Sequence, residues 1–396
     1  MSAHKPLEGV KVVELASFVA APTAGRMMAE MGADVIRVES TAGDPWRFYG
    51  ANCGLPITDE ENPLFDIYNL GKKDIQLNTK TPEGKEILFH LLDEADVFIT
   101  NNRLKSLVRS GLDYESLKDR FPKLIYGLVT GYGQTGPDVD APGYDGVAFF
   151  SRSGMLADMA EPSGYPASAP GCIGDGATGA ALFDRVRTGK GDFVEISLFG
   201  NAVWLCGTMS AFEQYGYHYP KKRSEMGALY TFYKCKDGEW LHLAVTQHDR
   251  YWKPLAEALN VPELAEDERF ANAALISKNR AQLIPLLEEA FSHFNYNEIA
   301  ARLKERDIVF DRMRHYRELA TDPQAVANGF VKEYIYESGH PFMMSMPPVH
   351  MRSVGETGPG RGPKPGEHTD EILKQLGCSE DEIVHLKEAG AVKQHS

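Results

Sequence analysis

The chain has 396 residues and a formal net charge of −14 at pH 7, with 43% hydrophobic and 25% charged residues. This length predicts about two or three globular domains. The acidic balance argues against nucleic-acid and membrane partners, and no apolar run is long enough to span a bilayer. Five scattered cysteines form neither a C-x-x-C pair nor a metal-like cluster, so we expect no metal and a reducing, cytoplasmic setting.

The first part of the chain alternates strands and helices. Residues 10–15 and 34–39 are predicted strands, and residues 22–31 between them form a predicted helix with Pro22 in its first turn. A crossover of this length joins parallel strands. The alternation continues with a helix at 82–94 and strands at 96–100, 124–129 and 191–198. We therefore expect an α/β, Rossmann-like large domain within residues 1–223.

The pattern changes at residues 224–315, which we predict to form a small α+β domain. Strand-like text at 229–233 leads into a hairpin turn at 236–239, and helical periodicity follows at 282–294 and 296–305. In the last segment, residues 316–396, we expect a strand at 347–352 and helices at 370–376 and 379–389.

One glycine-rich run imitates a dinucleotide-binding fingerprint. Residues 131–136 read G-Y-G-Q-T-G and follow a predicted strand. A nucleotide site of that kind also needs a helix to begin there, whereas Pro137 and Pro142 oppose a regular helix. We therefore predict a loop that does not bind NAD.

Basic residues adjoin two predicted strands. The first group, Lys72 and Lys73, precedes a strand. The second group follows another strand and consists of Asn101, Arg103, Lys105 and Arg109. In open parallel sheets, ligands bind beyond the carboxyl ends of strands, and cations there suit a polyphosphate. Ordinary solvated surface lysines are an equally good interpretation.

The candidate nucleophile is Asp175, in the run G-C-I-G-D-G-A-T-G at residues 171–179. Neighbouring glycines let a bound group approach the carboxylate and leave backbone N–H groups free for developing negative charge. Taken alone, an Asp-Gly pair is more often a turn.

Several segments together resemble the class III CoA-transferases, the family of formyl-CoA, carnitine and 2-hydroxyacyl CoA-transferases. They are LEGVKVVEL (7–15), MGADVIRVE (31–39), ADVFITNNR (95–103), GYGQTGP (131–137), GD (174–175), RTGKG (187–191) and PGEHT (365–369). The resemblance implies an interlocked, ring-shaped homodimer in which residues 316–396 return to complete the large domain.

The resemblance also implies the chemistry. Asp175 would attack an acyl-CoA, giving first a mixed anhydride and then an enzyme–CoA thioester, from which CoA passes to an acceptor carboxylate. Backbone N–H groups of Gly174, Gly176 or Gly179 are candidate oxyanion donors. The two basic groups would contact CoA. CoA thioesters and small carboxylic acids are substrates in this scheme, and no tightly bound cofactor is expected.

Two alternatives compete with this function. The related α-methylacyl-CoA racemases use an aspartate with a histidine, but Tyr144 occupies the histidine position here, and tyrosine is a poor base at neutral pH. Tyr144 and Asp145 could instead line the acyl pocket, or be a structural tyrosine and a turn aspartate. The segment between Asp175 and Arg185 is shorter than in the family, which favours a non-catalytic CoA-binding subunit as the other alternative.

The aromatic and methionine-rich residues 148–159 resemble the clostridial branch that moves CoA between 2-hydroxy acids and 2-enoates in amino-acid fermentation. Phenyllactate/cinnamate and 2-hydroxyisocaproate/isocaprenoate are the expected pairs. Such an aromatic stripe is, however, more often part of a core than of a pocket.

Overall fold

The computed structural model describes residues 5–155, 185–186, 188–216, 218, 222–245, 247–348, 354–355 and 357–395. These residues divide into two compact units. The first takes in the described residues within Met1–Gly154, Ala169–Thr208 and Ala320–Ser396, and the second those within Met155–Ser168 and Met209–Leu319.

A seven-stranded sheet forms the centre of the first unit, in the order β12-β3-β2-β1-β4-β5-β6. Its strands are β1 (Lys11–Leu15), β2 (Asp34–Glu39), β3 (Lys73–Leu77), β4 (Val97–Thr100), β5 (Ile125–Thr130), β6 (Phe193–Ser197) and β12 (Val392–Lys393). The first six are parallel, and β12 runs antiparallel to β3. The order of the six parallel strands is that of doubly wound α/β sheets. The predicted α/β fold with a parallel sheet is confirmed.

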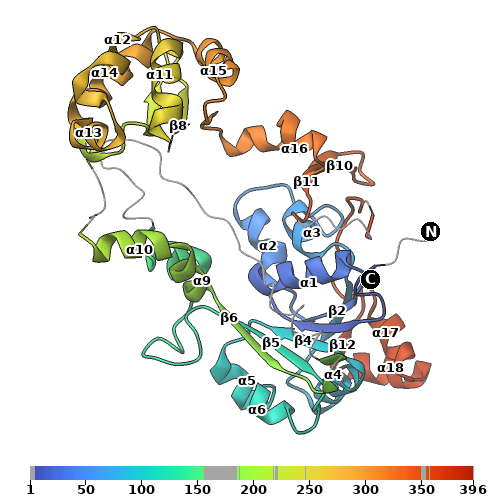
Figure 1. The fold of residues 1–396 in the computed structure, drawn as a ribbon. Coiled ribbons are helices and arrows are strands. Elements are labelled where there is room, and N and C mark those ends of the chain that lie inside the picture. Colours follow the sequence, from blue (N-terminus) through green and yellow to red (C-terminus); the bar gives the residue numbers. More distant parts are fainter. Residues whose placement is uncertain are drawn as a thin grey trace. The chain divides into compact units, whose positions relative to one another are not determined.

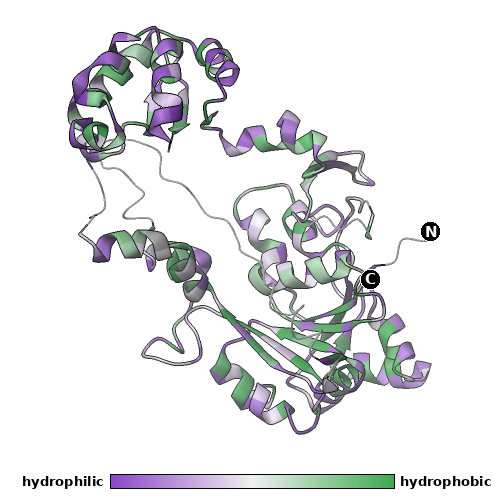
Figure 2. Ribbon diagram, in the orientation of Figure 1, coloured by the Kyte–Doolittle hydropathy of each residue, from purple (hydrophilic) through white to green (hydrophobic). Residues whose placement is uncertain are grey.

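Helices cover both faces of this sheet (Figure 1). Residues on α1 (Ala20–Glu30) bury one face of β1, β2, β4 and β5, with Val12 and Met28 among the contacts. The opposite face packs against the four helices α4 (Pro82–Glu94), α5 (Leu104–Ser110), α17 (Thr369–Gln375) and α18 (Glu380–Glu388), and against α6 (Tyr114–Leu117). Figure 2 shows the central strands in green, as expected for strands buried on both sides.

The end of the chain is built into this same unit. Strand β12 pairs with β3 through Val392 and Leu77, and His368 lies beside β3, where its Nδ1 accepts the Asp74 N–H at 3.2 Å. A separate antiparallel hairpin precedes it. The remaining elements of the unit are α2 (Pro45–Asn52), α3 (Pro63–Asn69), the π-helix η1 (Asp145–Ser151), α9 (Leu198–Leu205), α16 (Pro323–Ala327), β10 (Val331–Ile335) and β11 (Pro341–Ser345).

The second unit has its own core around a three-stranded antiparallel sheet. Its elements are β7 (Tyr230–Lys234), β8 (Trp240–Ala244), β9 (Phe310–Arg312), α11 (His248–Ala258), α12 (Glu263–Glu266), α13 (Ala273–Lys278), α14 (Arg280–Ser292) and α15 (Tyr296–Glu305), while α10 (Gly207–Gln214) spans the boundary between the units. The Tyr233 and Phe291 rings stack with centroids 4.6 Å apart in this core.

Of the predicted strand at 347–352, the structure describes only Pro347 and Pro348, and neither lies in a strand. Residues 349–352 lie outside the described part of the chain. The strand β11 ends before them, at Ser345, and prolines lack the N–H that a ladder requires.

Candidate active site

The strand order reverses between β1 and β4. Doubly wound sheets bind ligands at this switch point, beyond the carboxyl ends of the strands. Helix α1 leaves β1 toward one face, while α5 leaves β4 toward the other. Asn101, directly after β4, joins the two loops: its Oδ1 accepts the Ser17 N–H at 3.0 Å, and its Nδ2 donates to the Ser17 carbonyl at 2.7 Å. The predicted site residue Asn101 therefore lies at the carboxyl ends of the strands and fixes the loop after β1.

Phe18 follows in that loop and was not singled out from the sequence. Its φ of 62° is left-handed, which is uncommon for a bulky residue. Its ring contacts the Tyr144 ring edge-to-face at 5.3 Å and lies 6.4 Å from the Trp46 ring. No sequence pattern marks a non-glycine residue for this conformation, so only the structure could reveal it.

The predicted pocket residues Tyr144 and Asp145 are on the loop that follows β5. Tyr144 is 56% exposed and meets Phe18, so the structure brings it to the same edge of the sheet as Asn101. Asp145 begins the π-helix η1 and accepts the Gly146 N–H at 2.8 Å. No helix opens within residues 131–144, as predicted for the glycine-rich run.

The aromatic part of the predicted pocket segment is buried. Phe149 and Phe150 are each 5% exposed, and their rings pack against each other at 4.8 Å. Their position is that of core residues, and the residues from 156 onward lie outside the described part of the chain.

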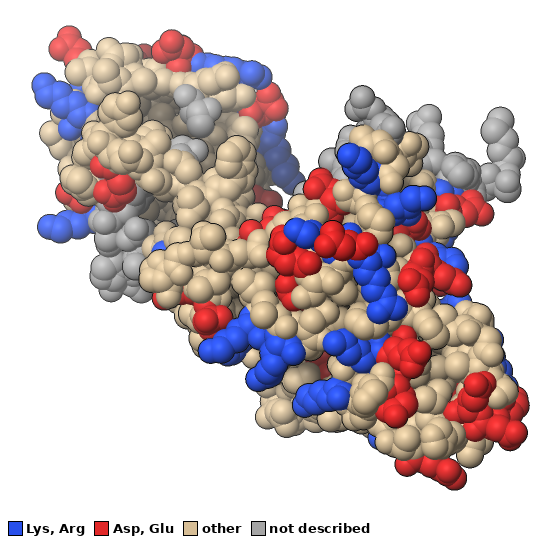
Figure 3. Space-filling view, turned by 90° about the horizontal axis from the view of Figure 1, so that it is seen from below, with Lys and Arg blue, Asp and Glu red and all other residues tan. Residues whose placement is uncertain are grey.

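Three predicted CoA contacts form an exposed basic group on and just before α5: Arg103, Lys105 and Arg109. Within the described residues these three side chains form no ion pair, although acidic side chains are abundant on the surface. Figure 3 shows basic and acidic side chains mixed on one face of the molecule, with several Lys and Arg side chains near its centre. A basic group without acidic partners is suited to an anionic ligand.

Lys72 and Lys73 lie elsewhere: Lys72 directly precedes β3 and Lys73 begins it. The Lys72 ammonium is fully buried and contacts both Glu14 carboxylate oxygens, at 2.8 and 3.1 Å, as well as the Pro22 carbonyl and Asn69 Oδ1. Burial lowers the pKa of Lys72 to about 8 even though Glu14 opposes the shift. A contact from this ammonium to CoA would require it to leave all four acceptors.

Lys73 begins β3 and pairs with Asp34, the first residue of β2, at 3.7 Å, and with Glu371 at 3.4 Å. Because β2, β3 and β4 are parallel, Lys73 lies at the amino ends of the strands, whereas the group on α5 follows a carboxyl end. The structure therefore places Lys73 and the group on α5 at opposite ends of their strands, whereas the Lys72 ammonium contacts the Pro22 carbonyl in the first turn of α1, after the carboxyl end of β1.

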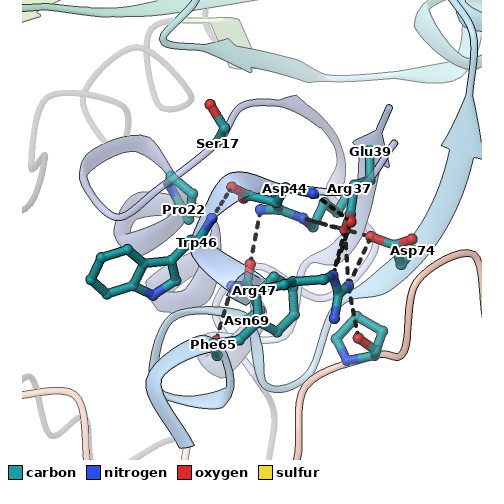
Figure 4. A network of polar contacts seen from close by, with 12 residues as sticks. Ser17, Pro22, Arg37, Glu39, Asp44, Trp46, Arg47, Phe65, Asn69 and Asp74 are labelled. Carbon is teal, nitrogen blue, oxygen red and sulfur yellow. Dashed lines mark hydrogen bonds and ion pairs between the residues drawn. The ribbon is translucent and has the colours of Figure 1, made fainter. Parts of the chain in front are cut away.

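A buried charge network centred on Arg37 supports the loops of the site (Figure 4). Its guanidinium contacts Glu14 at 3.0 Å, Asn69 at 3.1 Å and Asp44. Burial alone would lower the pKa of Arg37, but the surrounding carboxylates raise it above the ordinary value. Burial and the nearby Glu39 carboxylate raise the pKa of Asp74 well above its usual range.

The same network holds the returning end of the chain. Arg47 contacts both Glu39 oxygens and donates to the Pro363 carbonyl at 3.0 Å. Asp66 accepts hydrogen bonds from the Tyr336 hydroxyl at 2.6 Å and the Gly362 N–H at 2.7 Å. Burial raises the pKa of Asp66 to about 6 in spite of these bonds.

The nucleophile candidate Asp175 and the oxyanion candidates Gly174, Gly176 and Gly179 lie outside the described residues. Within the described part of the chain, no three His, Cys, Asp or Glu side chains gather as a metal site requires. Nor does any described helix have the length and apolarity needed to cross a membrane.

Comparisons with known proteins identify the family. The sequence model for CoA-transferase family III matches residues 7–369. The (R)-2-hydroxy-4-methylpentanoate CoA-transferase of Clostridioides difficile is 38% identical over 98% of this chain and 99% of its own. The cinnamoyl-CoA:phenyllactate CoA-transferase of Clostridium sporogenes is 36% identical over 96% and 95% of the two chains.

The fold has known counterparts as well. A crystal structure of a CAIB/BAIF family protein from Brucella suis superposes with a TM-score of 0.77 and 32% identity, over 94% of this chain and all of the other. The resemblance inferred from the sequence motifs is thus confirmed along nearly the whole chain. This chain belongs to CoA-transferase family III and is a CoA-transferase.

Proposed function

We propose that this enzyme moves CoA between a 2-hydroxy acid and a 2-enoyl-CoA, with Asp175 as the nucleophile. The observation that carries the proposal is the near-full-length similarity to two clostridial enzymes whose names specify 2-hydroxy-acid CoA transfer. The pair is phenyllactate with cinnamoyl-CoA or 2-hydroxyisocaproate with isocaprenoyl-CoA.

The proposed reaction needs no general base, because a carboxylate is already ionised at pH 7. Asp175 attacks the thioester carbonyl of the donor, and CoA leaves as a thiolate. The thiolate then attacks the aspartyl carbonyl of the mixed anhydride, which releases the free acid and leaves an aspartyl–CoA thioester. The acceptor carboxylate reverses both steps, so a new acyl-CoA leaves and Asp175 is regenerated.

Each of these attacks places negative charge on an oxygen. Backbone N–H groups of Gly174, Gly176 and Gly179 are the proposed donors to that oxygen, and one such donor is typically worth about 3 kcal/mol of barrier. Tyr144 is proposed to line the acyl site with Asp145, and its contact with Phe18 at the carboxyl end of β1 supports this position.

For the CoA moiety, we propose contacts from Asn101, Arg103, Lys105 and Arg109. Their place after β4 and the exposed, unpaired state of the three cations within the described residues support this assignment. Charge-assisted hydrogen bonds to phosphate are the strong class of hydrogen bond. Contacts from Lys72 and Lys73 stay predictions, with the Lys72 ammonium enclosed by Glu14.

The enzyme is proposed to act as an interlocked homodimer in the cytoplasm. Helix α9 leaves Val203, Trp204 and Leu205 at least half exposed, and large apolar side chains gathered on one helix are typical of interfaces. Cys53, Cys206, Cys235 and Cys378 are free thiols, which suits a reducing compartment.

The experiment follows CoA exchange by chromatography with acyl-CoA donors and a panel of acids that includes phenyllactate and 2-hydroxyisocaproate. Asp175→Ala should abolish exchange, while Asp119→Ala, at an exposed position just after α6, should keep it. Hydroxylamine should inactivate the wild-type enzyme only after acyl-CoA has been added, because it captures the acylated carboxylate.

Two results would contradict the proposal separately. Exchange on other acids, with none on either 2-hydroxy acid, would remove the substrate assignment and keep the mechanism. Activity that survives Asp175→Ala would remove Asp175 as the nucleophile.

A further inference from the structure

The left-handed backbone at Phe18 requires something to hold it. In this region of φ, the Cβ of an L-residue crowds the following carbonyl, at a cost of about 1–2 kcal/mol. Phe18 is half-buried at the carboxyl end of β1, beside the Asn101 amide that fixes Ser17. A strained residue persists only where its surroundings enforce it, and such residues gather at functional sites.

Asp44, the N-cap residue of α2, holds Phe18 in this conformation. Both oxygens of its carboxylate accept the Phe18 N–H, each at 3.2 Å. The Oδ1 atom also accepts the Trp46 N–H at 2.9 Å and so caps the helix. Asp44 is 2% exposed, so the carboxylate is aimed into the protein rather than toward solvent.

The carboxylate of Asp44 is in turn fixed by Arg37, as Figure 4 shows together with the contact to Trp46. The Asp44 N–H donates to Glu39 at 2.8 Å, which holds the backbone of Asp44 as well. A buried carboxylate with an ion pair and a backbone bond has little freedom to move. The anchor of Phe18 is therefore rigid.

The loop held in this way faces the candidate site. On one side Ser17 is bonded to Asn101 and on the other the Phe18 ring meets Tyr144, so a shift of this loop moves residues from β4 and β5 together. Misplacement by about 1 Å at a reacting centre can cost about 100-fold in rate.

We propose that Asp44 is a positioning residue for CoA transfer: through the Phe18 N–H it holds the loop after β1 in the geometry that the reaction requires. This inference rests on the proposed function. Asp44 touches neither CoA nor the acid in this role, so its loss should change turnover and leave the binding of acyl-CoA nearly intact.

The test compares Asp44→Ala with Asp113→Ala. Asp113 is 7% exposed and caps α6 by accepting the Ser116 N–H at 3.3 Å, so both variants lose a buried helix cap. Asp44→Ala alone also loses the Phe18 anchor and the carboxylate that pairs with Arg37. With the acid pair that the wild-type enzyme uses, we expect kcat about 100-fold lower for Asp44→Ala, with KM for acyl-CoA within about threefold. Asp113→Ala should keep kcat within about threefold.

A coupling measurement separates positioning from general loss of structure. Glycine adopts a φ of 62° without strain, so Asp44→Ala should lower kcat less in a Phe18→Gly background than in the wild type. Asp44→Asn keeps an oxygen for the Phe18 N–H and loses only the charge facing Arg37, so it should keep kcat within about threefold whether or not the alanine variant folds. A loss of about 100-fold in Asp44→Asn would overturn the role assigned to the Phe18 anchor.

Equal kcat values for the Asp44→Ala and Asp113→Ala variants would overturn the positioning role, as would independent effects of the changes at Asp44 and Phe18. A wild-type enzyme that exchanges CoA with other acids but not with the 2-hydroxy acids overturns only the substrate assignment, and the Asp44 comparison is then made with the acids that it uses. A wild-type enzyme without CoA exchange on any acid overturns the proposed function, and the inference with it.

Discussion

In the large unit, Arg37 and a group of three other cations carry the same positive charge but differ in burial and in ion pairing. Arg37 is completely buried and is bound by Glu14, Asp44 and Asn69. Arg103, Lys105 and Arg109 are exposed and form no ion pair within the described residues. The sequence presents all of them simply as basic residues, with Arg37 inside a predicted strand and the other three after one.

The two positions differ in how the positive charge is compensated. A buried guanidinium is retained only if carboxylates compensate its desolvation, so Arg37 is committed to holding loops and the returning chain end together. An exposed cation loses little by staying unpaired, which leaves it available to a phosphate. We therefore assign stability to the buried Arg37 and propose ligand binding for the exposed group.

Deleting one positive charge from each position tests whether the two roles differ. Arg37→Leu leaves Asp44 and its neighbouring carboxylates without their partner and should lower the free energy of unfolding by about 3–5 kcal/mol. Arg109→Leu should change it by less than about 0.5 kcal/mol. Urea unfolding followed by circular dichroism measures both, and equal losses would contradict the division into two roles.

The next largest effect is a pH dependence from Asp66. Its pKa is about 6 in the folded protein against an ordinary 3.8, because burial disfavours the charged form. Between these values the folded state keeps a proton that the unfolded chain has lost. The stabilisation from this group is therefore complete below about pH 4 and is lost as the pH rises through 6; the gap corresponds to about 3 kcal/mol.

Asp66→Asn removes this titration while keeping an oxygen for the Gly362 N–H. The stability of the wild type relative to Asp66→Asn should therefore rise as the pH falls from 7 to 4, which unfolding curves at several pH values will show. Asp119→Asn, at an exposed site, is the control for replacing a carboxylate by an amide. A flat difference for Asp66→Asn itself would mean that this carboxyl titrates normally.

Much of the fold was predictable because periodicity and capping residues decide it locally. Thr81 and Pro82 begin α4, whose predicted bounds 82–94 match the structure, and the tyrosine-led helix at 296–305 also matches. The hairpin β10–β11 and the short strand β12 were not foreseen, because their pairing depends on partners far along the chain. Sequence text does not reveal such partners.

The candidate site was predictable to a smaller extent. Asn101 and Tyr144 were named from their place after strands and from family motifs, and both lie at the carboxyl ends of the strands. The burial of Lys72 was not foreseen, because a lysine before a strand normally faces solvent. In the structure Glu14, the Pro22 carbonyl and Asn69 hold its ammonium inside the protein. The roles of Asp44 and Phe18 depend on a backbone angle that no pattern encodes.

A smaller effect should come from the exposed cations. Replacing Arg103 and Arg109 together by alanine should raise KM for acyl-CoA by about tenfold, because two charged donors to phosphate are lost, while kcat changes little. Added salt should raise KM more for the wild type than for the double variant, since exposed charges are screened. Steady-state kinetics at two ionic strengths test both points.

The control for this effect is Lys118→Ala, an exposed cation on the neighbouring α6 turn that already pairs with Glu115. It should leave KM and its dependence on salt unchanged. If Lys118→Ala raises KM as much as the double change does, the effect reflects overall charge and the assigned group is not a specific binding site.

The smallest and most specific prediction concerns Phe18. Phe18→Gly and Phe18→Ala both lose the ring, and they differ only in backbone freedom. Because φ is 62°, alanine pays the left-handed strain and glycine does not, so Phe18→Gly should be more stable by about 0.5–1 kcal/mol after the entropy of glycine is counted.

Phe89, within α4, is the matched position, where the same pair should differ by about 1 kcal/mol in the opposite direction, because glycine disfavours a helix. Thermal unfolding of the four variants measures the two differences. A reversal of sign between positions 18 and 89 means that the loop after β1 is held under strain. The same sign at both means that Phe18 relaxes to an ordinary conformation and that Asp44 has no strain to hold.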